Sequence, residues 1–281
     1  MLKKRVLTSV IGIPILVAVL WFDSFLPLFT ILAVTLGILS NLECARLISL
    51  SKTKIFVVYS IILTIGVIAL RDSTVLPFIG ASPDALWIPG VLIAGTALPL
   101  LVTPFFLKRQ TPGTYDRLSG LWTTVAILYN GWLISNLIGL RGLEDGRNWV
   151  FLSLFVTFAY DTSAFFTGRS LGRHKMAPRI SPGKTWEGAA GGVVGAVLVS
   201  LFFTLPTPLG LPLPWYHAVI LGLLVSLFGQ SGDLLESAFK RYTGVKDSGN
   251  ALPGHGGWLD RLDSIVFAGL VVYYYAVWVL Q

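Results

Sequence analysis

The chain has 281 residues, of which 54% are hydrophobic and only 12% are charged, and its formal net charge is +7. Soluble domains carry about 25% charged residues, so this composition predicts an all-α, polytopic membrane protein and excludes a disordered chain or a coiled coil. The single cysteine, Cys44, excludes an internal disulfide and a Cys-based metal site. The placement of the positive charge follows the expected membrane topology, so no nucleic-acid partner is expected.

Apolar runs that could cross a bilayer recur along the whole chain. A transmembrane helix needs about 20 mostly apolar residues. Nine segments are predicted as spans: 6–22, 25–40, 55–70, 86–107, 118–140, 149–168, 187–206, 214–232 and 264–280. The first span follows a basic N-terminus, as in a signal peptide, but no small-residue cleavage site follows it. A retained first helix is therefore predicted, joined to the second by a tight hairpin at Asp23 and Ser24.

The basic residues indicate how these helices are oriented. If the connections alternate between two sides from the N-terminus onward, one side carries 18 of the 21 Lys and Arg residues. Cytoplasmic loops hold the excess of basic residues, so the N-terminus is expected in the cytoplasm and the C-terminus outside. The protein is then a multi-pass protein of the plasma or inner membrane.

Polar residues concentrate in two connections on the expected cytoplasmic side, residues 169–186 and 233–263. The connections on the opposite side are short and plain. We therefore expect residues 1–148, with about five spans, to form a scaffold. Residues 149–281, with about four spans, are expected to carry the activity at the cytoplasmic face.

Asp161 lies inside the sixth predicted span. An ionisable residue within a span is energetically costly and is by default a sign of function. Its expected position, about two helical turns from the cytoplasmic end, would give the carboxylate partial access to water. The alternative is a carboxylate that only locks neighbouring helices by hydrogen bonds.

The connection after this span contains the sequence G-K-T at 183–185, which looks like the end of a phosphate-binding P-loop. The complete pattern requires a glycine where this chain has Pro178, and no strand is expected before it. A lysine beside hydroxyl groups at a helix start nevertheless suits phosphate. Ser181, Lys184 and Thr185 are therefore candidate binding residues.

The basic residues of this connection also have a simpler explanation. They satisfy the positive-inside rule by themselves, and Arg169 is expected to serve only that purpose. The span that follows begins with glycines at small-xxx-small spacing, which favours close helix packing. These glycines are Gly188, Gly191, Gly192 and Gly195.

The second polar connection combines carboxylates, basic residues and glycines. One helical face, at positions i, i+3, i+4 and i+7, would carry Asp233, Glu236, Ser237 and Lys240. Asp260 and Asp263 would share a face where the last span begins. Mg²⁺ prefers one or two carboxylates together with substrate phosphates and waters, so this segment offers ligands for a metal ion and basic groups for phosphate. A merely solvated loop would not explain so many acids at the membrane edge.

The three histidines are not assigned as general bases. His255 stands between Gly254 and Gly256, where the backbone can approach a ligand closely. It either contacts phosphate or stabilises the loop. His174 and His217 are expected to be incidental.

These residues resemble the phosphatidate cytidylyltransferase (CDP-diacylglycerol synthase) family, whose C-terminal pattern is S-x-x-K-R-x4-K-D followed by H-G-G-x-x-D-R-x-D. The matching positions are Ser237, Lys240, Arg241, Lys246, Asp247, His255, Gly256, Gly257, Asp260, Arg261 and Asp263. The element S-P-x-K-T-x-E-G at 181–188 and Asp161 also fit the family. Two positions depart from it: Gly183 is often a lysine, and Trp258 is usually aliphatic.

The resemblance implies that CTP and phosphatidic acid react to give CDP-diacylglycerol and pyrophosphate. It implies that Asp233 and Asp260 hold Mg²⁺, as one ion or a metal pair. Three further acids would complete or orient the metal shell: Asp161, Asp247 and Asp263. The triphosphate and the lipid phosphate would be bound by Lys184, Lys240, Arg241, Lys246 and Arg261. Further substrate contacts would come from Ser181, Thr185, Ser237 and His255. A homodimer is also expected from the family.

This chemistry suits the residue types. The second pKa of a phosphate monoester is near 6, so the lipid phosphate is already a dianionic nucleophile at neutral pH and needs no strong protein base. The remaining obstacles are repulsion between anions and the departing pyrophosphate. Both call for a metal ion and for Lys and Arg side chains.

Two other readings are weighed. A CTP-dependent polyprenol or phytol kinase of the same superfamily would move the terminal phosphate to a hydroxyl. A transporter is the alternative of a different class, but transporters place charges near the bilayer midplane, often within repeats. Here the charges cluster at one membrane face and no repeat is visible. The pattern of CDP-alcohol phosphotransferases is absent from the sequence.

Overall fold

The apolar segments fold into helices, which pair their backbone N–H and C=O groups internally as a bilayer requires. The computed structural model describes residues 2–22, 27–51, 53–79, 87–107, 118–252, 254 and 256–280. The predicted hairpin at Asp23 and Ser24 lies outside the described residues, and so does His255. The chain divides into two compact units, one comprising Met1–Gly142 with Tyr242–Arg261 and the other Leu143–Arg241 with Leu262–Gln281.

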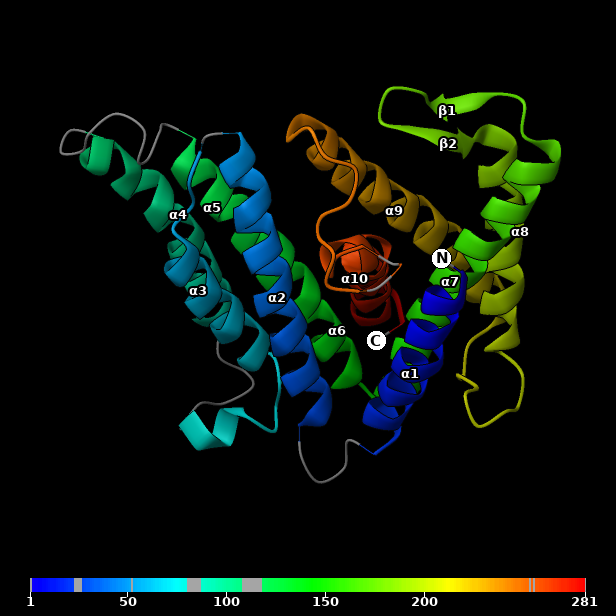
Figure 1. Cartoon of the computed structure of the whole chain (residues 1–281). Helices are drawn as coiled ribbons and strands as arrows, with labels where there is room; N and C mark the ends of the chain where they lie inside the picture. Colours follow the sequence, from blue (N-terminus) through cyan, green and yellow to red (C-terminus); the bar gives the residue numbers. More distant parts are fainter. Residues whose placement is uncertain are drawn as a thin grey trace. The chain divides into compact units, whose positions relative to one another are not determined.

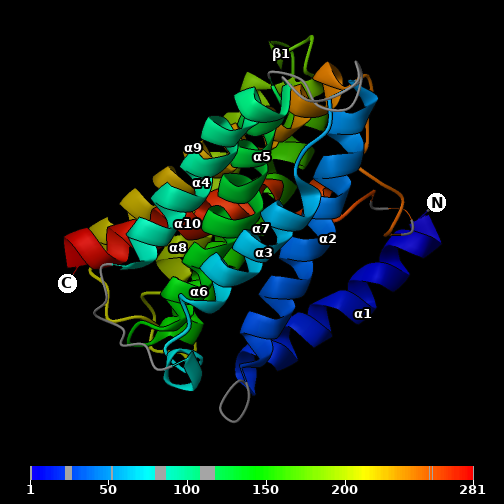
Figure 2. The same cartoon turned by 90° about the vertical axis from the view of Figure 1, so that its left-hand side faces the viewer.

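The first unit consists mainly of helices (Figures 1 and 2). In chain order these are α1 (Leu2–Trp21), α2 (Leu28–Leu50), α3 (Val57–Ala69), the 3-10 helix η1 (Leu76–Ile79), α4 (Trp87–Leu107) and α5 (Ser119–Ile127). The π-helical turn η2 (Leu128–Leu133) and α6 (Ile134–Arg141) continue α5 as one long helix. Both views show α2, α3 and α5 lying side by side.

A buried polar network joins the helices of the first unit. Asn41 on α2 donates from Nδ2 to Thr64 Oγ1 at 3.0 Å and accepts from Ser60 Oγ at 2.6 Å, both on α3. All three residues are fully buried. Buried polar groups need such partners because water cannot replace them, so this network fixes how α2 and α3 pack.

The second unit contains the remaining helices and the only strands among the described residues (Figure 1). In chain order its elements are α7 (Gly146–Leu171), β1 (Lys175–Ala177), β2 (Ser181–Thr185), α8 (Trp186–Phe202), α9 (Trp215–Tyr242) and α10 (Leu259–Tyr275), which the π-helical turn η3 (Ala276–Leu280) extends. The strands form an antiparallel hairpin in which Lys175 pairs with Thr185 and Ala177 pairs with Ser181. The last residue of α9 and the first three of α10 belong to the first unit.

Two helices extend beyond the predicted membrane spans into the charged segments. The helical spacing from Asp233 to Lys240 predicted a helix that continues past the span 214–232, and α9 does continue to Tyr242. Asp260 and Asp263 were expected where the last helix begins, and α10 begins at Leu259, before the predicted span 264–280. Helical hydrogen bonding continues past the apolar stretch because ion pairs such as Glu236–Lys240, at i and i+4, stabilise it. The expectation of no strand before the G-K-T sequence is wrong, because β2 itself carries that sequence.

The helices have the composition of membrane-embedded elements. Among the residues that the structure describes, five helices are long and apolar enough to cross a membrane: Leu28–Leu50, Ser119–Arg141, Gly146–Leu171, Trp215–Tyr242 and Leu259–Leu280. Shorter apolar helices accompany them. Large apolar side chains face outward, and Val58, Leu101 and Leu227 remain 72%, 66% and 63% exposed. Apolar surface of this kind is stable against lipid and costly in water, so the chain is a helical membrane protein.

Candidate functional site

Helices α7 and α8 pack closely because α8 presents glycines to α7. A Cβ atom on Gly192 would lie 2.7 Å from the ring of Tyr160, and one on Gly188 would lie 2.9 Å from the main-chain oxygen of Ala164. No larger residue fits these positions without moving a helix. The predicted role of these glycines in close packing is therefore confirmed.

The β1–β2 hairpin lies directly before α8 and is closed at its base by Glu187. The main-chain N–H groups of Arg173 and His174 donate to Glu187 Oε2 at 3.1 and 3.2 Å, and His174 Nδ1 lies 2.6 Å from Oε1. His174, which was expected to be incidental, therefore has a structural contact, because its side chain helps to hold the hairpin.

Thr185 ends β2 and caps α8. Its side-chain oxygen accepts a hydrogen bond from the N–H of Gly188 at 3.1 Å, as an N-cap residue does. The hairpin therefore leads straight into the N-terminus of α8, where the helix dipole favours negative charge. Thr185, Gly188 and Ala189 from this helix start line a cavity.

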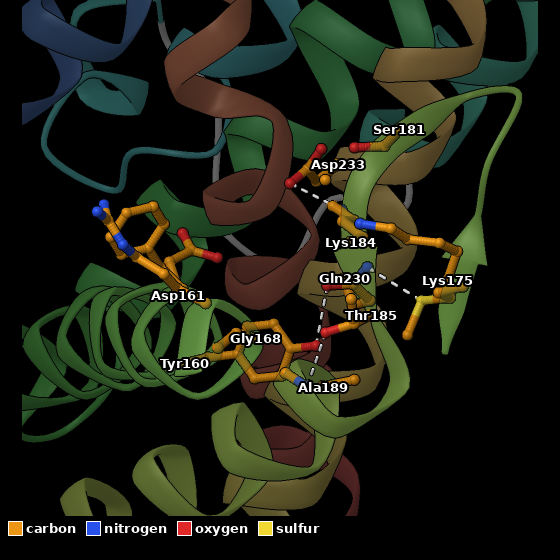
Figure 3. Close-up of a pocket in the computed structure, with 16 residues that line it drawn as sticks. Tyr160, Asp161, Gly168, Lys175, Ser181, Lys184, Thr185, Ala189, Gln230 and Asp233 are labelled. Carbon is orange, nitrogen blue, oxygen red and sulfur yellow. Dashed lines mark hydrogen bonds and ion pairs between the residues drawn. The ribbon is translucent and has the colours of Figure 1, made fainter. Parts of the chain in front are cut away.

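The cavity has a volume of about 560 Å³ and lies within the second unit (Figure 3). Ligand sites in proteins typically measure about 300–1,000 Å³. The residues that line it come from α7, the hairpin, α8 and α9: Tyr160, Asp161, Ala164, Phe165, Gly168, Arg169, Lys175, Met176, Ser181, Gly183, Lys184, Thr185, Gly188, Ala189, Gln230 and Asp233. Five predicted site residues thus meet at one cavity: Asp161, Ser181, Lys184, Thr185 and Asp233.

An ion pair crosses this cavity from the hairpin to α9. Lys184 Nζ lies 2.8 Å from Asp233 Oδ2, and Figure 3 shows the two side chains pointing toward one another. The two side chains are only 19% and 29% exposed. Ser237, one turn further along α9, donates from Oγ to Asp233 Oδ1 at 3.2 Å. Asp233 is therefore held in place by residues from two elements.

Eleven of the sixteen lining residues were not among the predicted site residues, and Arg169, Tyr160 and Gln230 are three of these. Arg169, which was expected to act as a topology charge, also lines the cavity. Tyr160 donates from its hydroxyl to Gln230 Oε1 at 2.8 Å and so joins α7 to α9 (Figure 3). The sequence signal for Arg169 was its position two turns after Asp161 on the same helix face.

The C-terminal end of α9 carries two more of the predicted phosphate-binding residues. Lys240 is buried and forms an ion pair with Glu236 on the preceding turn. Arg241 donates from Nε to the main-chain oxygen of Ile180 in the hairpin turn at 3.1 Å. The hairpin is therefore tied to α9 at two points, by Lys184 to Asp233 and by Arg241 to Ile180.

Asp263 lies next to this region in the second unit. Helix α10 packs on α9 where Gly232 allows it, since a Cβ atom there would collide with the main-chain oxygen of Asp263. Asp263 accepts a hydrogen bond from Ser264 N at 2.7 Å and interacts electrostatically with Asp233 and Asp161. Three predicted acids are thus electrostatic neighbours in this unit.

The remaining predicted residues belong to the first unit. Asp260 is buried, and its Oδ2 accepts hydrogen bonds from Ser248 N at 2.9 Å, Ser248 Oγ at 3.0 Å and Gly257 N at 2.8 Å. The side chains of three others are exposed: Lys246, Asp247 and Arg261.

His217, which was expected to be incidental, contacts the hydroxyl of Tyr275 at 2.7 Å in the second unit.

The carboxylates around Asp233 are suited to a divalent cation that is bound together with its substrate. Within the described part of the chain, no three His, Cys, Asp or Glu side chains come together as a ready-made metal cage. Mg²⁺ does not require one, because it usually takes one or two carboxylates and completes its shell with substrate phosphates and waters. Asp233 with its electrostatic neighbour Asp263 meets that requirement, so the residues fit a metal that arrives with its substrate.

Comparisons with known proteins identify the family of this chain. Residues 3–279 match the model of the cytidylyltransferase family. The chain is 38% identical over 274 residues to a phosphatidate cytidylyltransferase of Bacillus subtilis, covering 97% of both chains. It is 34% identical over 280 residues to one of Brucella abortus, covering 97% of this chain and 92% of that protein. A third, from Staphylococcus saprophyticus, is 32% identical over 270 residues and 95% of each chain. A family match over nearly the whole length, together with these identities, shows that the chain belongs to the cytidylyltransferase family.

Proposed function

We propose that this protein transfers the cytidylyl group of CTP to phosphatidate and releases pyrophosphate. The observation that carries the proposal is the cavity of the second unit, where Lys184, Asp233 and the start of α8 converge. Its lining offers positive charge for a triphosphate and a carboxylate for a cation. The relatives that bear the name phosphatidate cytidylyltransferase supply the substrate assignment.

In the proposed reaction an oxygen of the lipid phosphate attacks the α-phosphorus of CTP. A new P–O bond forms there, the bond from the α-phosphorus to the bridging oxygen breaks, and pyrophosphate departs with the electron pair. The lipid phosphate is already dianionic near pH 7, so no side chain needs to remove a proton. The protein therefore has to orient the lipid phosphate, the α-phosphate of CTP and the departing pyrophosphate, and to offset the repulsion between these anions.

The residues of the cavity divide this task. Lys184 and Arg169 would neutralise the phosphates, and the N-terminus of α8 would add the favourable end of its dipole. Ser181 would donate a hydrogen bond from β2. Lys240, Arg241, Lys246 and Arg261 are proposed to contribute further positive charge, as the family pattern predicts.

Mg²⁺ is proposed as the cofactor, as a single ion or a pair. Bound Mg²⁺ would polarise the phosphoryl oxygens and stabilise the departing pyrophosphate. Asp233 is the proposed ligand in the second unit, with Asp263 and Asp161 as its neighbours. Asp260 and Asp247 are proposed as further ligands on the basis of the family pattern.

The topology forms part of the proposal. Nine spans with a cytoplasmic N-terminus and an external C-terminus would place the hairpin, and with it the cavity, on the cytoplasmic side where CTP is present. A cysteine introduced at Arg179 in the hairpin, in a Cys44→Ala background, should react with a membrane-impermeant maleimide only from the cytoplasmic side. A cysteine at Pro208 should react only from the outside, and the reverse pattern would contradict the topology.

Residues 149–281 are proposed to carry the reaction, and residues 1–148 to serve as scaffold.

A homodimer is also proposed. The mass of the detergent-solubilised protein by light scattering should be twice 30.6 kDa after subtraction of the detergent. A mass of one chain would contradict the dimer and leave the reaction unaffected.

The decisive experiment follows label from CTP into lipid. Purified protein in detergent receives phosphatidate, Mg²⁺ and CTP labelled on either the α- or the γ-phosphate. We expect α-label in the organic phase, its loss in EDTA, and no γ-label. Transfer of γ-label, to a polyprenol or phytol acceptor added in parallel, would instead show a kinase. Substrate flux into proteoliposomes with no transfer of either label would support a transporter.

A further inference from the structure

Glu43 lies on α2, in the part of the chain that the sequence assigned to the scaffold, yet it binds the segment that carries the family pattern. Its carboxylate accepts hydrogen bonds from Ser248 Oγ at 2.8 Å and from the main-chain N–H groups of Trp258 and Leu259, both at 3.0 Å. The acceptor and its donors are 205 to 216 positions apart in sequence. All of these residues belong to the first unit.

Two carboxylates share one hydroxyl in this arrangement. Ser248 Oγ lies 2.8 Å from Glu43 Oε2 and 3.0 Å from Asp260 Oδ2. A serine hydroxyl carries a single proton, so it can donate to only one of the two acids at a time. Ser248 N and Gly257 N supply Asp260 with further donors. Glu43 and Asp260 are thus coupled through Ser248.

The loop between these donors is shaped for the two carboxylates. A Cβ atom on Gly249 would lie 2.7 Å from Glu43 Oε1, and one on Gly257 would collide with Glu43 Oε2 and Ser248 Oγ. Gly256 has a φ of +82°, which favours glycine, and packs against Asp260. A main-chain hydrogen bond from Leu252 N to Gly256 O at 2.9 Å closes the turn. Close backbone approach at these positions therefore serves the two acids.

Glu43 also determines where α10 begins. The first N–H groups of a helix lack partners within the helix, and here the N–H groups of Trp258 and Leu259 find the Glu43 carboxylate. An anion at this end also interacts favourably with the helix dipole. Asp260 is the second residue of α10. The orientation of its side chain therefore depends on Glu43 through the helix start and through Ser248.

We propose that Glu43 is a positioning residue that orients Asp260 and the 248–258 loop for the reaction. The inference rests on the proposed function, in which Asp260 is a metal ligand, and it assigns to α2 a direct role in the activity. Residues that orient metal ligands typically contribute about 10–100-fold to metal affinity or activity. Loss of Glu43 should therefore act on the Mg²⁺ dependence and on kcat, with little effect on the KM for phosphatidate.

The test compares Glu43→Gln with Asp72→Asn as a matched control. Gln has the shape of Glu, but an NH₂ group replaces one carboxylate oxygen. This NH₂ group would face a main-chain N–H that needs an acceptor, at Trp258 or Leu259. Asp72 also accepts hydrogen bonds from a main-chain N–H and from hydroxyls, and these donors belong to Thr74 and Thr30 in the first unit, outside the 248–258 loop. Glu43→Gln is expected to lower kcat by about 10–100-fold and to raise the half-saturating Mg²⁺ concentration. Asp72→Asn is expected to change neither.

A second measurement does not depend on activity. Hydrogen exchange followed by mass spectrometry should show faster exchange in the peptide covering residues 248–260 in Glu43→Gln, and unchanged exchange in Asp72→Asn. Ser248→Ala tests whether Glu43 acts through the Ser248 hydroxyl. If it does, the double variant Glu43→Gln with Ser248→Ala should lose less activity than the product of the two single losses. Wild-type exchange in this peptide for Glu43→Gln would overturn the proposal. So would a loss of activity that follows only the amount of folded protein, with wild-type Mg²⁺ dependence.

Failure of the proposed function would look different. If wild-type protein moved no α-label into lipid, the reaction would be wrong, while the exchange measurement would still decide whether Glu43 holds the loop. If the wild type is active and Asp260→Asn is inactive, but Glu43→Gln has wild-type kinetics, the positioning role alone is wrong.

Discussion

Lys184 and Asp233 form an ion pair of 2.8 Å that joins the hairpin strand β2 to helix α9. The two residues are far apart in sequence, and the ion pair lies where helix α9 meets the β1–β2 hairpin. An ion pair in a partly exposed cavity contributes little to stability by itself. In the proposed function, the lysine would turn to a phosphate and the carboxylate would bind the cation.

Asp233→Asn should lower the rate of α-label transfer by at least about 100-fold, the effect typical of removing one group that stabilises transition-state charge. Asparagine keeps the shape and can still accept from Ser237, so the protein should remain folded and extractable. Steady-state assays with Asp145→Asn as control test this, because Asp145 is in the same unit, and asparagine tolerates its left-handed backbone (φ 54°). Substantial activity in Asp233→Asn would remove this acid from the metal site.

Asp260→Asn should abolish turnover as well, but with a loss of stability that Asp233→Asn does not show. Its carboxylate accepts three hydrogen bonds in the loop before α10. A hydrogen bond to a charged group contributes about 1.5–3 kcal/mol, so the melting temperature in detergent should fall for Asp260→Asn alone. Equal melting temperatures for the two variants would mean that the loop contacts of Asp260 do not stabilise the fold.

Arg169→Gln should raise the KM for CTP by about fivefold, corresponding to the roughly 1 kcal/mol that an exposed ion contact contributes. Arg173→Gln is the matched control, because Arg173 follows in the same connection and does not line the cavity. Its KM should equal that of the wild type. Equal KM values for both variants would return Arg169 to a role in topology alone.

Gly192→Leu should reduce the yield of folded protein, because a side chain there meets the Tyr160 ring and Ala164 at the α7–α8 contact. Overpacking of this kind costs about 1–3 kcal/mol. Gly183→Ala is the control, since a Cβ atom at Gly183 meets no neighbour within 4 Å. Size-exclusion profiles of both variants after mild heating would reveal the difference, and identical profiles would show that the helix contact is adaptable.

Gly183→Lys should lower the KM for CTP and leave the fold intact. Family members often carry a lysine at this position, and Gly183 lines the cavity with open space beside it. An added ammonium group would therefore face the phosphates. Steady-state assays at several CTP concentrations test this, and an unchanged or higher KM would show that the side chain of residue 183 does not reach the nucleotide.

Much of the fold was predictable because its determinants are local. Runs of apolar residues long enough to cross a bilayer marked the helices, and glycines at small-xxx-small spacing marked the contact between α7 and α8. The helical spacing of the polar residues from Asp233 to Lys240 also predicted that a helix continues beyond the span 214–232. Helical hydrogen bonds and the Glu236–Lys240 pair carry α9 to Tyr242.

The residues of the family pattern were also predictable, because acids, lysines and glycines at a fixed spacing can be recognised from the sequence without knowledge of the fold. That pattern determined the family, the candidate metal ligands and the phosphate-binding groups. It did not show that Ser181, Lys184 and Thr185 lie on a strand. A hairpin depends on the pairing of its two short strands and on the hydrogen bonds that Glu187 provides, and neither has a strong local signal.

The sequence by itself thus determined that this is a helical membrane protein and which family it resembles. Only the tertiary structure decided that Arg169 lines the cavity and that Glu43 holds the loop before α10. Glu43 is more than 200 residues from its hydrogen-bond partners, and an isolated acid on an apolar helix looks the same in sequence whatever it contacts. Such a role depends on which distant donors the folded chain brings to the carboxylate, and the residues adjacent to Glu43 in sequence do not indicate which donors these are.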